Sequence, residues 1–335
     1  MVNESAHLLR RMSTLIIILT VILAIAALLG VSIGSSGIDL AETLEVLSGR
    51  SSVDSASYAI IWQIRFPRVV LAAVVGATLA LGGLVFQALL RNPLAEPYIL
   101  GVSGGSAIGA ILAMMVGLSP FPGVSLAAFA GSMITLALLL LISSGRMMVN
   151  RDSLLLAGVM TNAFCGAVIM FLISLSMSRE IRHILFWLMG DLSMFSISQL
   201  PLLLGVVPSF VIIFVLARPM NLLLMGKENA AVMGVEVKLV TNLLLVATTF
   251  MVSIAVSHSG LIGFVGLVIP HILRLLVGFD HRLLVPASIL SGASFLIVCD
   301  LLARTLPIDG EMPVGIITAL IGAPLFIFLL WRSNR

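Results

Sequence analysis

The sequence predicts an all-α polytopic membrane protein with ten transmembrane helices, and two observations support this prediction. Hydrophobic residues make up 60% of the 335 residues, charged residues only 10%, and the mean hydropathy is +1.21, whereas a soluble domain is about 25% charged. Long apolar stretches alternate with short loops that carry most of the charge. About 20 apolar residues cross a bilayer as a helix, whereas barrel strands are about half as long and alternate in polarity. Residues 1–335 are therefore expected to form a single transmembrane domain.

Each predicted span is one of these apolar stretches, because only a helix or a closed barrel satisfies every backbone polar group in lipid. The spans are 12–38, 69–90, 97–118, 120–145, 153–178, 192–217, 239–257, 259–273, 283–299 and 312–331. The eighth and ninth are the shortest, because Arg274 and Asp300 interrupt them.

The distribution of basic residues predicts the orientation. An even number of spans places both termini on the same side of the membrane. With Arg10 and Arg11 on the cytoplasmic side, twelve of the eighteen Lys and Arg residues fall in loops on that side, as the positive-inside rule requires. Both termini are therefore expected to be cytoplasmic. The same rule accounts for the net charge of +3 and the pI near 9.3, so no nucleic-acid partner is expected.

The sequence indicates no catalytic site, no metal site and no nucleotide-binding loop. Gly101, Gly105 and Gly109 recur every four residues, but no Gly-Lys-Ser/Thr follows them, so they predict close packing against a neighbouring helix. A secondary transporter usually carries an ionisable residue near the membrane midplane, and the predicted spans contain almost none. Energy for transport is therefore expected from another subunit.

Several loop motifs together indicate a family. They are RFPR at 65–68, RNPLAEPYILGVSGG at 91–105, GLIGFVGLVIPHILR at 260–274, DHR at 280–282, GEMPVG at 310–315 and GAP at 322–324. In this order they resemble the FecCD-type permease subunits of ATP-binding-cassette (ABC) importers for ferric siderophores, haem and cobalamin. The resemblance extends from about residue 65 to the C-terminus.

This resemblance implies the type II ABC importer permease fold, with ten transmembrane helices per subunit, in the cytoplasmic (inner) membrane of a prokaryote. It also implies three partners. A second copy of the chain completes a central path, two cytoplasmic ATPases bind ATP and Mg²⁺, and a periplasmic binding protein delivers the substrate. No cofactor is expected in this chain itself.

The resemblance also places a cytoplasmic coupling segment at residues 226–236. Its matching residues are Gly226, Lys227, Glu228, Ala230, Ala231 and Gly234. The two alanines are expected to keep a short helix narrow enough to enter a cleft of the ATPase, and Gly234 is expected to end it in a left-handed cap. The alternative is an ordinary amphipathic surface helix.

A cytoplasmic gate is implied in the same way at Asn92 and Leu94, with Arg151 and Asp152 before the fifth span. Proline disfavours helix in the residue before it, so the Asn-Pro and Glu-Pro pairs of the first loop predict a stiff connection. Arg151 and Asp152 are charged where relatives can carry small hydroxyl residues, so closure by an ion pair and no closure at this point are both open. The alternative for both loops is a structural turn.

The fifth span is the expected path-lining helix by the same resemblance. Its candidate residues are Met160, Asn162, Met170, Ser174 and Met177. Thioethers are adaptable and weakly polar, so such a path suits a large, partly apolar chelate better than a bare ion. The alternative is a methionine-filled core.

The resemblance assigns Arg65, Arg68 and Arg304 to docking of the binding protein. Guanidinium groups suit this role because they present a planar fork to a carboxylate and stay protonated. The alternative is that these arginines anchor helix ends at the lipid headgroups.

The predicted function is the permease subunit of an ABC importer that moves a large metal chelate from a periplasmic binding protein to the cytoplasm. The chain is expected not to be an enzyme, because ATP hydrolysis belongs to the separate ATPase. The alternatives are a proton-coupled secondary transporter, an exporter of small molecules and an intramembrane enzyme. The sequence leaves the chelate unidentified.

Overall fold

The structure is a computed structural model, and it describes residues 2–34, 38–50, 52, 55–143, 151–307 and 310–333. In this part of the chain every regular element is helical. The longer helices are α1 (Val2–Ser32), α2 (Leu40–Leu47), α4 (Phe66–Leu90), α5 (Val102–Met115), α6 (Ser125–Ser143), α7 (Arg151–Leu175), α8 (Ser178–Leu188), α10 (Val207–Val215), α11 (Ala217–Leu224), α13 (Val237–Ser259), α14 (Val265–Val277), α15 (His281–Thr305) and α16 (Val314–Ser333). Shorter turns are α3 (Ala56–Ala59), η1 (Ile60–Arg65), η2 (Pro97–Leu100), η3 (Pro120–Val124), η5 (Ile197–Gln199), α9 (Leu200–Leu203), η6 (Leu204–Val206) and α12 (Lys227–Val232).

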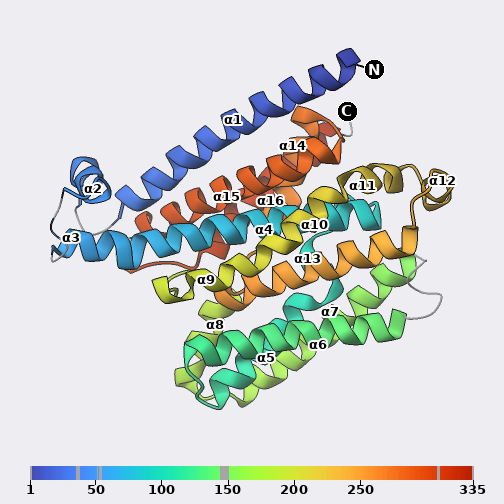
Figure 1. Ribbon diagram of the computed structural model, residues 1–335. Coiled ribbons are helices and arrows are strands. Elements are labelled where there is room, and N and C mark those ends of the chain that lie inside the picture. The colour runs from blue at the N-terminus through green and yellow to red at the C-terminus, as the bar shows by residue number, and fades with distance from the viewer. Residues whose placement is uncertain are drawn as a thin grey trace.

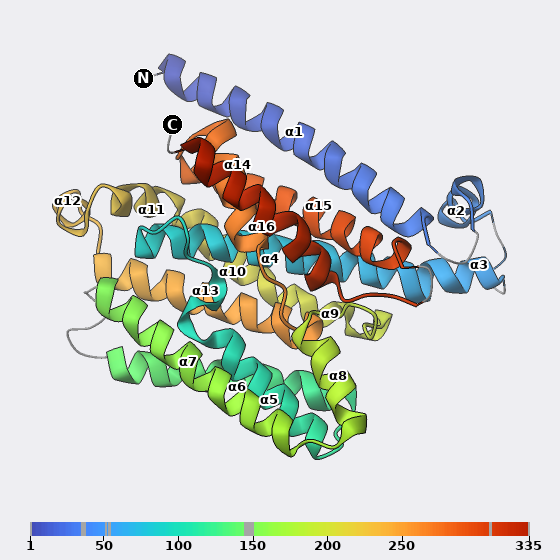
Figure 2. The same ribbon diagram turned by 180° about the vertical axis from the view of Figure 1, so that it is seen from behind.

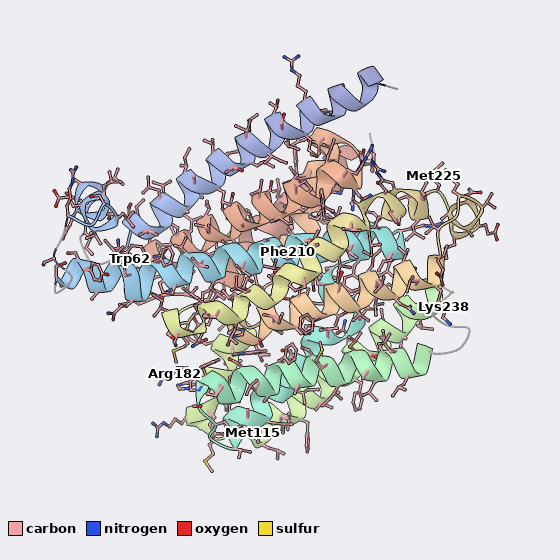
Figure 3. All side chains as sticks on the ribbon, in the orientation of Figure 1. Trp62, Met115, Arg182, Phe210, Met225 and Lys238 are labelled. Carbon is pink, nitrogen blue, oxygen red and sulfur yellow. The ribbon has the colours of Figure 1, made fainter. Side chains whose placement is uncertain are left out.

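The helices form a bundle with two distinct ends (Figure 1). The end that carries α11 and α12 also carries the N-terminus and the C-terminus, and we call it the α12 end. The opposite end carries α2 and α3, and we call it the α2 end (Figure 2). Labelled side chains mark the two ends in Figure 3. Met225 and Lys238 lie at the α12 end, and Trp62 and Arg182 lie at the α2 end.

The prediction of an all-helical, ten-span fold is confirmed. Seven helices in the described residues are long and apolar enough to cross a membrane, and three shorter apolar helices, α5, α14 and α16, coincide with the remaining predicted spans. Helices α4, α13 and α15 form the buried centre, whereas α1 and α7 bury few of their side chains.

Small residues allow the central helices to approach closely. A Cβ atom added at Gly76 of α4 would collide with the backbone carbonyl of Gly292 of α15. Gly83 of α4 meets Gly266 of α14 in the same way, and Gly105 of α5 meets α6 at Gly131. In lipid, such contacts supply the van der Waals packing that holds helices together. The close packing predicted for Gly105 is therefore confirmed.

The prediction that Arg274 and Asp300 interrupt the eighth and ninth spans is wrong. Helix α14 continues through Arg274, whose Nη1 donates to the buried Gln87 Oε1 at 2.5 Å. Helix α15 continues through Asp300 to Thr305, because Arg68 and Arg304 neutralise the carboxylate. These partners reduce the cost that an isolated buried charge would incur, and Gln87 and Arg68 both come from α4, far away in the sequence.

Helix α8 was also missed by the sequence analysis, which treated residues 179–191 as a loop. Its first turns carry Arg179, Glu180 and Arg182, and Ile184 is its one fully buried side chain. The helix is too short and too polar at its start to read as a span.

Candidate functional site

The three arginines predicted to dock a binding protein lie at the α2 end in one buried charge cluster. Arg65, Arg68 and Arg304 are only 4%, 6% and 8% exposed. Arg68 Nε donates to Asp300 Oδ1 at 2.9 Å. Arg304 Nε lies 3.0 Å from Asp300 Oδ2 and donates to the Asp300 carbonyl oxygen at 3.4 Å, so the Oδ2 contact is an ion pair rather than a well-directed hydrogen bond. The central carboxylate of Asp300 is fully buried.

Two of these arginines also bind the last turn of α1. Arg304 Nη2 donates to the carbonyl oxygen of Gly30 at 3.0 Å, and Arg65 Nη1 donates to those of Val31 and Ser32 at 2.9 and 2.6 Å. The last four carbonyl groups of a helix have no partner within the helix, and cations are favoured at this end of the helix dipole. The arginines therefore cap α1 and hold it against α4 and α15.

Glu311 connects the charge cluster to the surface. Arg68 Nη1 donates to Glu311 Oε2, and the side chain of Glu311 is 46% exposed. On its solvent side, Arg68 is thus already paired with a carboxylate of the same chain, that of Glu311. A docking role for Arg68 remains a prediction, and it requires an incoming carboxylate to compete with Glu311.

The predicted gate loop lies at the α12 end, where α4 ends. Arg91 ends α4 in a left-handed conformation with φ of 46°, and its Nη2 donates to the carbonyl oxygen of Leu223 at 2.7 Å. Asn92 Oδ1 accepts from the backbone N–H of Leu94 at 2.9 Å, which forms a tight local turn. The side chain of Leu94 is 50% exposed. Burial of the neighbouring Glu96 raises its pKa.

Tyr98, which the sequence analysis did not assign, fixes the second half of this loop. Its Oη donates to the carbonyl oxygen of Ile262 at 3.0 Å and accepts from the Ile262 N–H at 3.1 Å. Asn162 Nδ2 donates to the carbonyl oxygen of Tyr98 at 2.9 Å. The loop is thereby tied to α7 and to the turn before α14, as the two prolines led us to expect of a stiff connection.

The second pair of predicted gate residues, Arg151 and Asp152, begins α7. Their side chains lie outside the part of the chain that the structure describes, so their predicted role stays a prediction.

Four of the five predicted path residues are exposed, three of them on α7 and Met177 just beyond its end. Met160, Met170 and Met177 are 58%, 70% and 75% exposed, and Ser174 is exposed as well. Asn162 differs, because it is half-buried and bonded to the loop at Tyr98. The exposed thioethers and the Ser174 hydroxyl offer a surface with neither formal charge nor strong hydrogen-bonding groups, whereas Asn162 positions α7.

The predicted coupling segment forms the short helix α12, which projects from the bundle (Figure 1). Lys227 and Glu228 begin the helix, after Gly226 with φ of 120°. Gly234 has φ of 86°, so the predicted left-handed cap is confirmed. Ala230 is fully buried within this chain, whereas Ala231 is exposed. Of the two alanines, only Ala231 is therefore accessible from outside the chain.

The outward tip of α12 is apolar. Val232 is 89% exposed and Met233 is 59% exposed. The end of α12 thus presents two adjacent apolar side chains at its surface.

Asn221 of α11 binds the start of α15, a contact that the sequence analysis missed. Its Nδ2 donates to Asp280 Oδ1 at 2.8 Å, and its Oδ1 accepts from the His281 N–H at 2.9 Å. Burial alone would raise the pKa of Asp280, but hydrogen bonds from Arg282 and Asn221 outweigh it and lower the pKa to about 2. In the sequence, the Asp-His-Arg triplet at 280–282 was visible as a motif. No sequence feature connected it with Asn221, about 60 positions earlier.

A cavity of about 830 Å³ opens between α5, α6 and α7, and its walls are almost entirely apolar. Met160 is the one predicted path residue among its lining. No group of three His, Cys, Asp or Glu side chains that could hold a metal ion occurs within the described ranges.

The loop motifs, the seven long and three shorter apolar helices and the projecting α12 are those expected of one transport family. Comparison with known proteins agrees. The model of the FecCD transport family matches residues 21–332 of this chain. The chain belongs to the FecCD transport family. The resemblance noted from the loop motifs is thus confirmed, and the chain is an ABC transporter permease.

Relatives of known function and structure support this assignment. The chain is 42% identical over 277 residues to the "Vitamin B12 import system permease protein BtuC" of Salmonella typhi, which covers 82% of this chain and 84% of that protein. The protein of the same name from Salmonella arizonae is 43% identical over 277 residues, again 82% of this chain and 84% of that protein. An inward-facing structure of a metal-chelate type ABC transporter is 34% identical, with a TM-score of 0.83 over 96% of this chain and 99% of that chain. The structure of PsaBC from Streptococcus pneumoniae shares the fold, with a TM-score of 0.56 and 19% identity over 79% of this chain and 90% of that chain.

Proposed function

We propose that this FecCD-family permease works as a homodimer with two ATPase subunits and a periplasmic binding protein, and imports a large metal chelate, with cobalamin as the first candidate. The observation that carries the proposal is α12. It projects at the α12 end with Val232 and Met233 exposed, which suits insertion into a cleft of an ATPase.

The ATPase supplies ATP and Mg²⁺ in this proposal, and the permease supplies the path. Docking at α12 then places the ATPases on the cytoplasmic side. The N-terminus and the C-terminus lie at the same end as α12, which supports a topology with both termini in the cytoplasm of a prokaryotic cell and the α2 end in the periplasm.

Helices α7 and α16 are the proposed contribution to a path between two copies of the chain. Phe164 and Phe171 of α7 are 68% and 60% exposed, and Leu320 and Ile327 of α16 are 66% and 67% exposed. Met170 is a further exposed apolar side chain of α7, and Met177 is exposed just beyond the end of α7, before α8 begins. Flexible thioethers can adapt to a large substrate without holding it tightly.

Cobalamin is the first candidate because relatives at 42% and 43% identity are vitamin B12 import permeases. The fixed loop at Asn92 and Leu94 is the proposed cytoplasmic gate, together with Arg151 and Asp152. Arg65, Arg68 and Arg304 are the proposed contacts of the binding protein, and an acidic group on that protein would have to displace Glu311 from Arg68.

The substrate is tested by comparing uptake in two strains. One strain lacks the gene for this chain, and the other is the same strain complemented with the gene on a plasmid. Radiolabelled cobalamin, haem and a ferric siderophore are supplied in separate arms, each with and without a protonophore. We expect cobalamin to accumulate only in the complemented cells. Accumulation of another chelate would replace cobalamin as the substrate, and accumulation that requires the proton gradient but no ATPase would contradict the proposal.

A further inference from the structure

Asn221 makes three contacts with two consecutive residues at the start of α15. Besides the two hydrogen bonds to Asp280 Oδ1 and the His281 N–H, its Oδ1 lies 2.7 Å from His281 Nδ1. Because Oδ1 is an acceptor, this contact requires the proton on Nδ1 of the imidazole. We call Asn221, Asp280 and His281 the clasp.

The clasp holds a helix terminus that is already organised. Asp280 is the N-cap of α15 and accepts from the Arg282 N–H at 3.0 Å. Its Oδ2 lies 2.6 Å from Arg282 Nη2. His281 is 1% exposed. One side chain of α11 is therefore fixed to the first residues of a 25-residue helix. A displacement of α11 must either move that helix or break these partly buried hydrogen bonds.

A second link starts two residues after Asn221. Arg91 Nη2 donates to the carbonyl oxygen of Leu223, and Arg91 directly precedes the proposed gate residues Asn92 and Leu94. Helix α11 is thus bonded to the gate loop on one side and to α15 on the other, while its C-terminal end leads into α12.

Helix α15 connects the two ends of the bundle. Its 25 residues span about 37 Å. At the clasp end lies His281, and near the other end Asp300 pairs with Arg68 and Arg304. Along its length α15 packs against α4 through the contact of Gly292 with Gly76. Pro286 lies inside the helix near its start. Close packing against α4 leaves α15 little room to deform, so a displacement of its first turn is passed on along its length.

We propose that the clasp is the element that makes α15 move with the coupling segment, and that Asn221 is its positioning residue. The gate loop is bonded to the same helix α11 by the separate contact of Arg91 with Leu223. This inference rests on the proposed function, since it takes α12 as the contact of the ATPase. ATP turnover at the α12 end and occupancy of the charge cluster at the α2 end are then coupled through α15. Such coupling is reciprocal, so a docked binding protein alters ATP turnover through the same helix.

The test uses charge exchange within the clasp in the complete transporter, purified on this chain with its ATPase and binding protein. Asn221→Asp replaces the hydrogen bond to Asp280 with two opposed carboxylates and should open the clasp at Asp280, although its oxygen still accepts from His281. Combining it with Asp280→Asn restores a donor and an acceptor in reversed positions, with one carboxylate as before. Asp39→Asn is the matched control, because Asp39 caps α2 by accepting from the Glu42 N–H but contacts no element of the clasp.

Phosphate release is measured with and without the cobalamin-loaded binding protein, and the ratio of the two rates is compared. We expect Asn221→Asp to assemble and to keep basal ATP hydrolysis within about twofold, while the stimulation ratio falls about tenfold, within the usual range of coupling between sites. The exchanged pair should recover the ratio of the unaltered complex, and Asp39→Asn should not change it.

Full stimulation in Asn221→Asp, or no recovery in an exchanged pair that assembles, overturns the inference. Asn221→Ala is the second variant, because it removes the three contacts without adding charge, and full stimulation in it also overturns the inference. Failure of all three variants to assemble assigns Asn221 to folding and overturns it as well. If the unaltered chain does not assemble with an ATPase, or if the binding protein does not stimulate ATP hydrolysis by the unaltered complex, the proposed function fails instead.

Discussion

Arg68 and Asp300 form a buried ion pair across 232 positions of sequence, with Arg68 Nε 2.9 Å from Asp300 Oδ1. The pair joins α4 to α15 at the α2 end, and Arg304 completes it one helical turn further along α15. Asp300 is thus the acceptor that allows two guanidinium groups to lie inside the bundle.

Asp300→Ala should strongly destabilise the protein. The change leaves Arg304 buried without the carboxylate it pairs with and leaves Arg68 with Glu311 alone. Removal of one partner from a buried pair costs about 3–5 kcal/mol. Thermal unfolding in detergent should therefore start at a clearly lower temperature. Glu311→Gln is the matched control, since its side chain is 46% exposed and such pairs contribute about 1 kcal/mol or less. Equal unfolding temperatures for Asp300→Ala and the unaltered chain would contradict this account of the cluster.

Glu311→Gln should strengthen docking of the binding protein if Arg68 contacts it. The change removes the carboxylate that competes for Arg68, so we expect the affinity at low salt to rise about threefold, with the gain shrinking as salt screens the charges. Surface-immobilised transporter and soluble binding protein allow both rates to be measured. An unchanged affinity at low salt would argue that Arg68 has no docking role. Charge reversal of Arg68 itself would be a poorer test, because the side chain is buried and the change would disturb the fold.

Ala231→Trp should reduce assembly with the ATPase without unfolding the permease. Ala231 is exposed on α12, so a large ring there meets only the partner and overpacks its cleft. Ala230→Trp is the contrasting variant, because Ala230 is fully buried within this chain and should lower the unfolding temperature itself. The amount of ATPase recovered with each purified variant gives the readout. Normal assembly of Ala231→Trp would remove α12 as the coupling contact.

Cysteine labelling should place the α2 end outside and α12 inside the cell. Val116 is 78% exposed in the connection between α5 and α6, and Val232 is 89% exposed on α12. The native Cys165 and Cys299 are buried and should react slowly. In spheroplasts, an impermeant thiol reagent should label Val116→Cys directly and Val232→Cys only after permeabilisation. The reverse pattern would invert the proposed topology.

Asp280 should contribute stability that disappears in acid. Its pKa in the folded protein is lowered to about 2, below the usual value of about 3.9. A lowered pKa stabilises the fold fully above the unfolded value, by about 2 kcal/mol here, and the contribution is lost as pH falls through the folded value. Asp280→Asn should therefore lower the unfolding temperature at pH 6, with a smaller difference as pH approaches 2. A difference that is constant with pH would show that the carboxylate charge is not the cause.

The ten spans followed from the sequence because their apolar length is a local property. The left-handed cap at Gly234 was likewise predicted from the residue type, since few other residues adopt that conformation without strain. The family resemblance depended on loop motifs and was also readable without a structure.

The contacts that organise the two ends were not predictable in this way. Asp300 looked like the end of a span until its partners on α4 and α15 were known, and the Asn221 contact joins residues about 60 positions apart. Burial of Ala230, but not of Ala231, likewise depends on how α12 packs against its own chain. Such tertiary contacts decide which predicted site residues can reach a partner.

ATP-driven uptake by a purified system tests the central claim most directly. This permease and its ATPase are reconstituted into proteoliposomes with ATP inside, and cobalamin-loaded binding protein is added outside in the presence of a protonophore. The account predicts accumulation of radiolabelled cobalamin that requires ATP, the ATPase and the binding protein together. Uptake that continues without the ATPase, or stops with the protonophore while ATP is still hydrolysed, would contradict it.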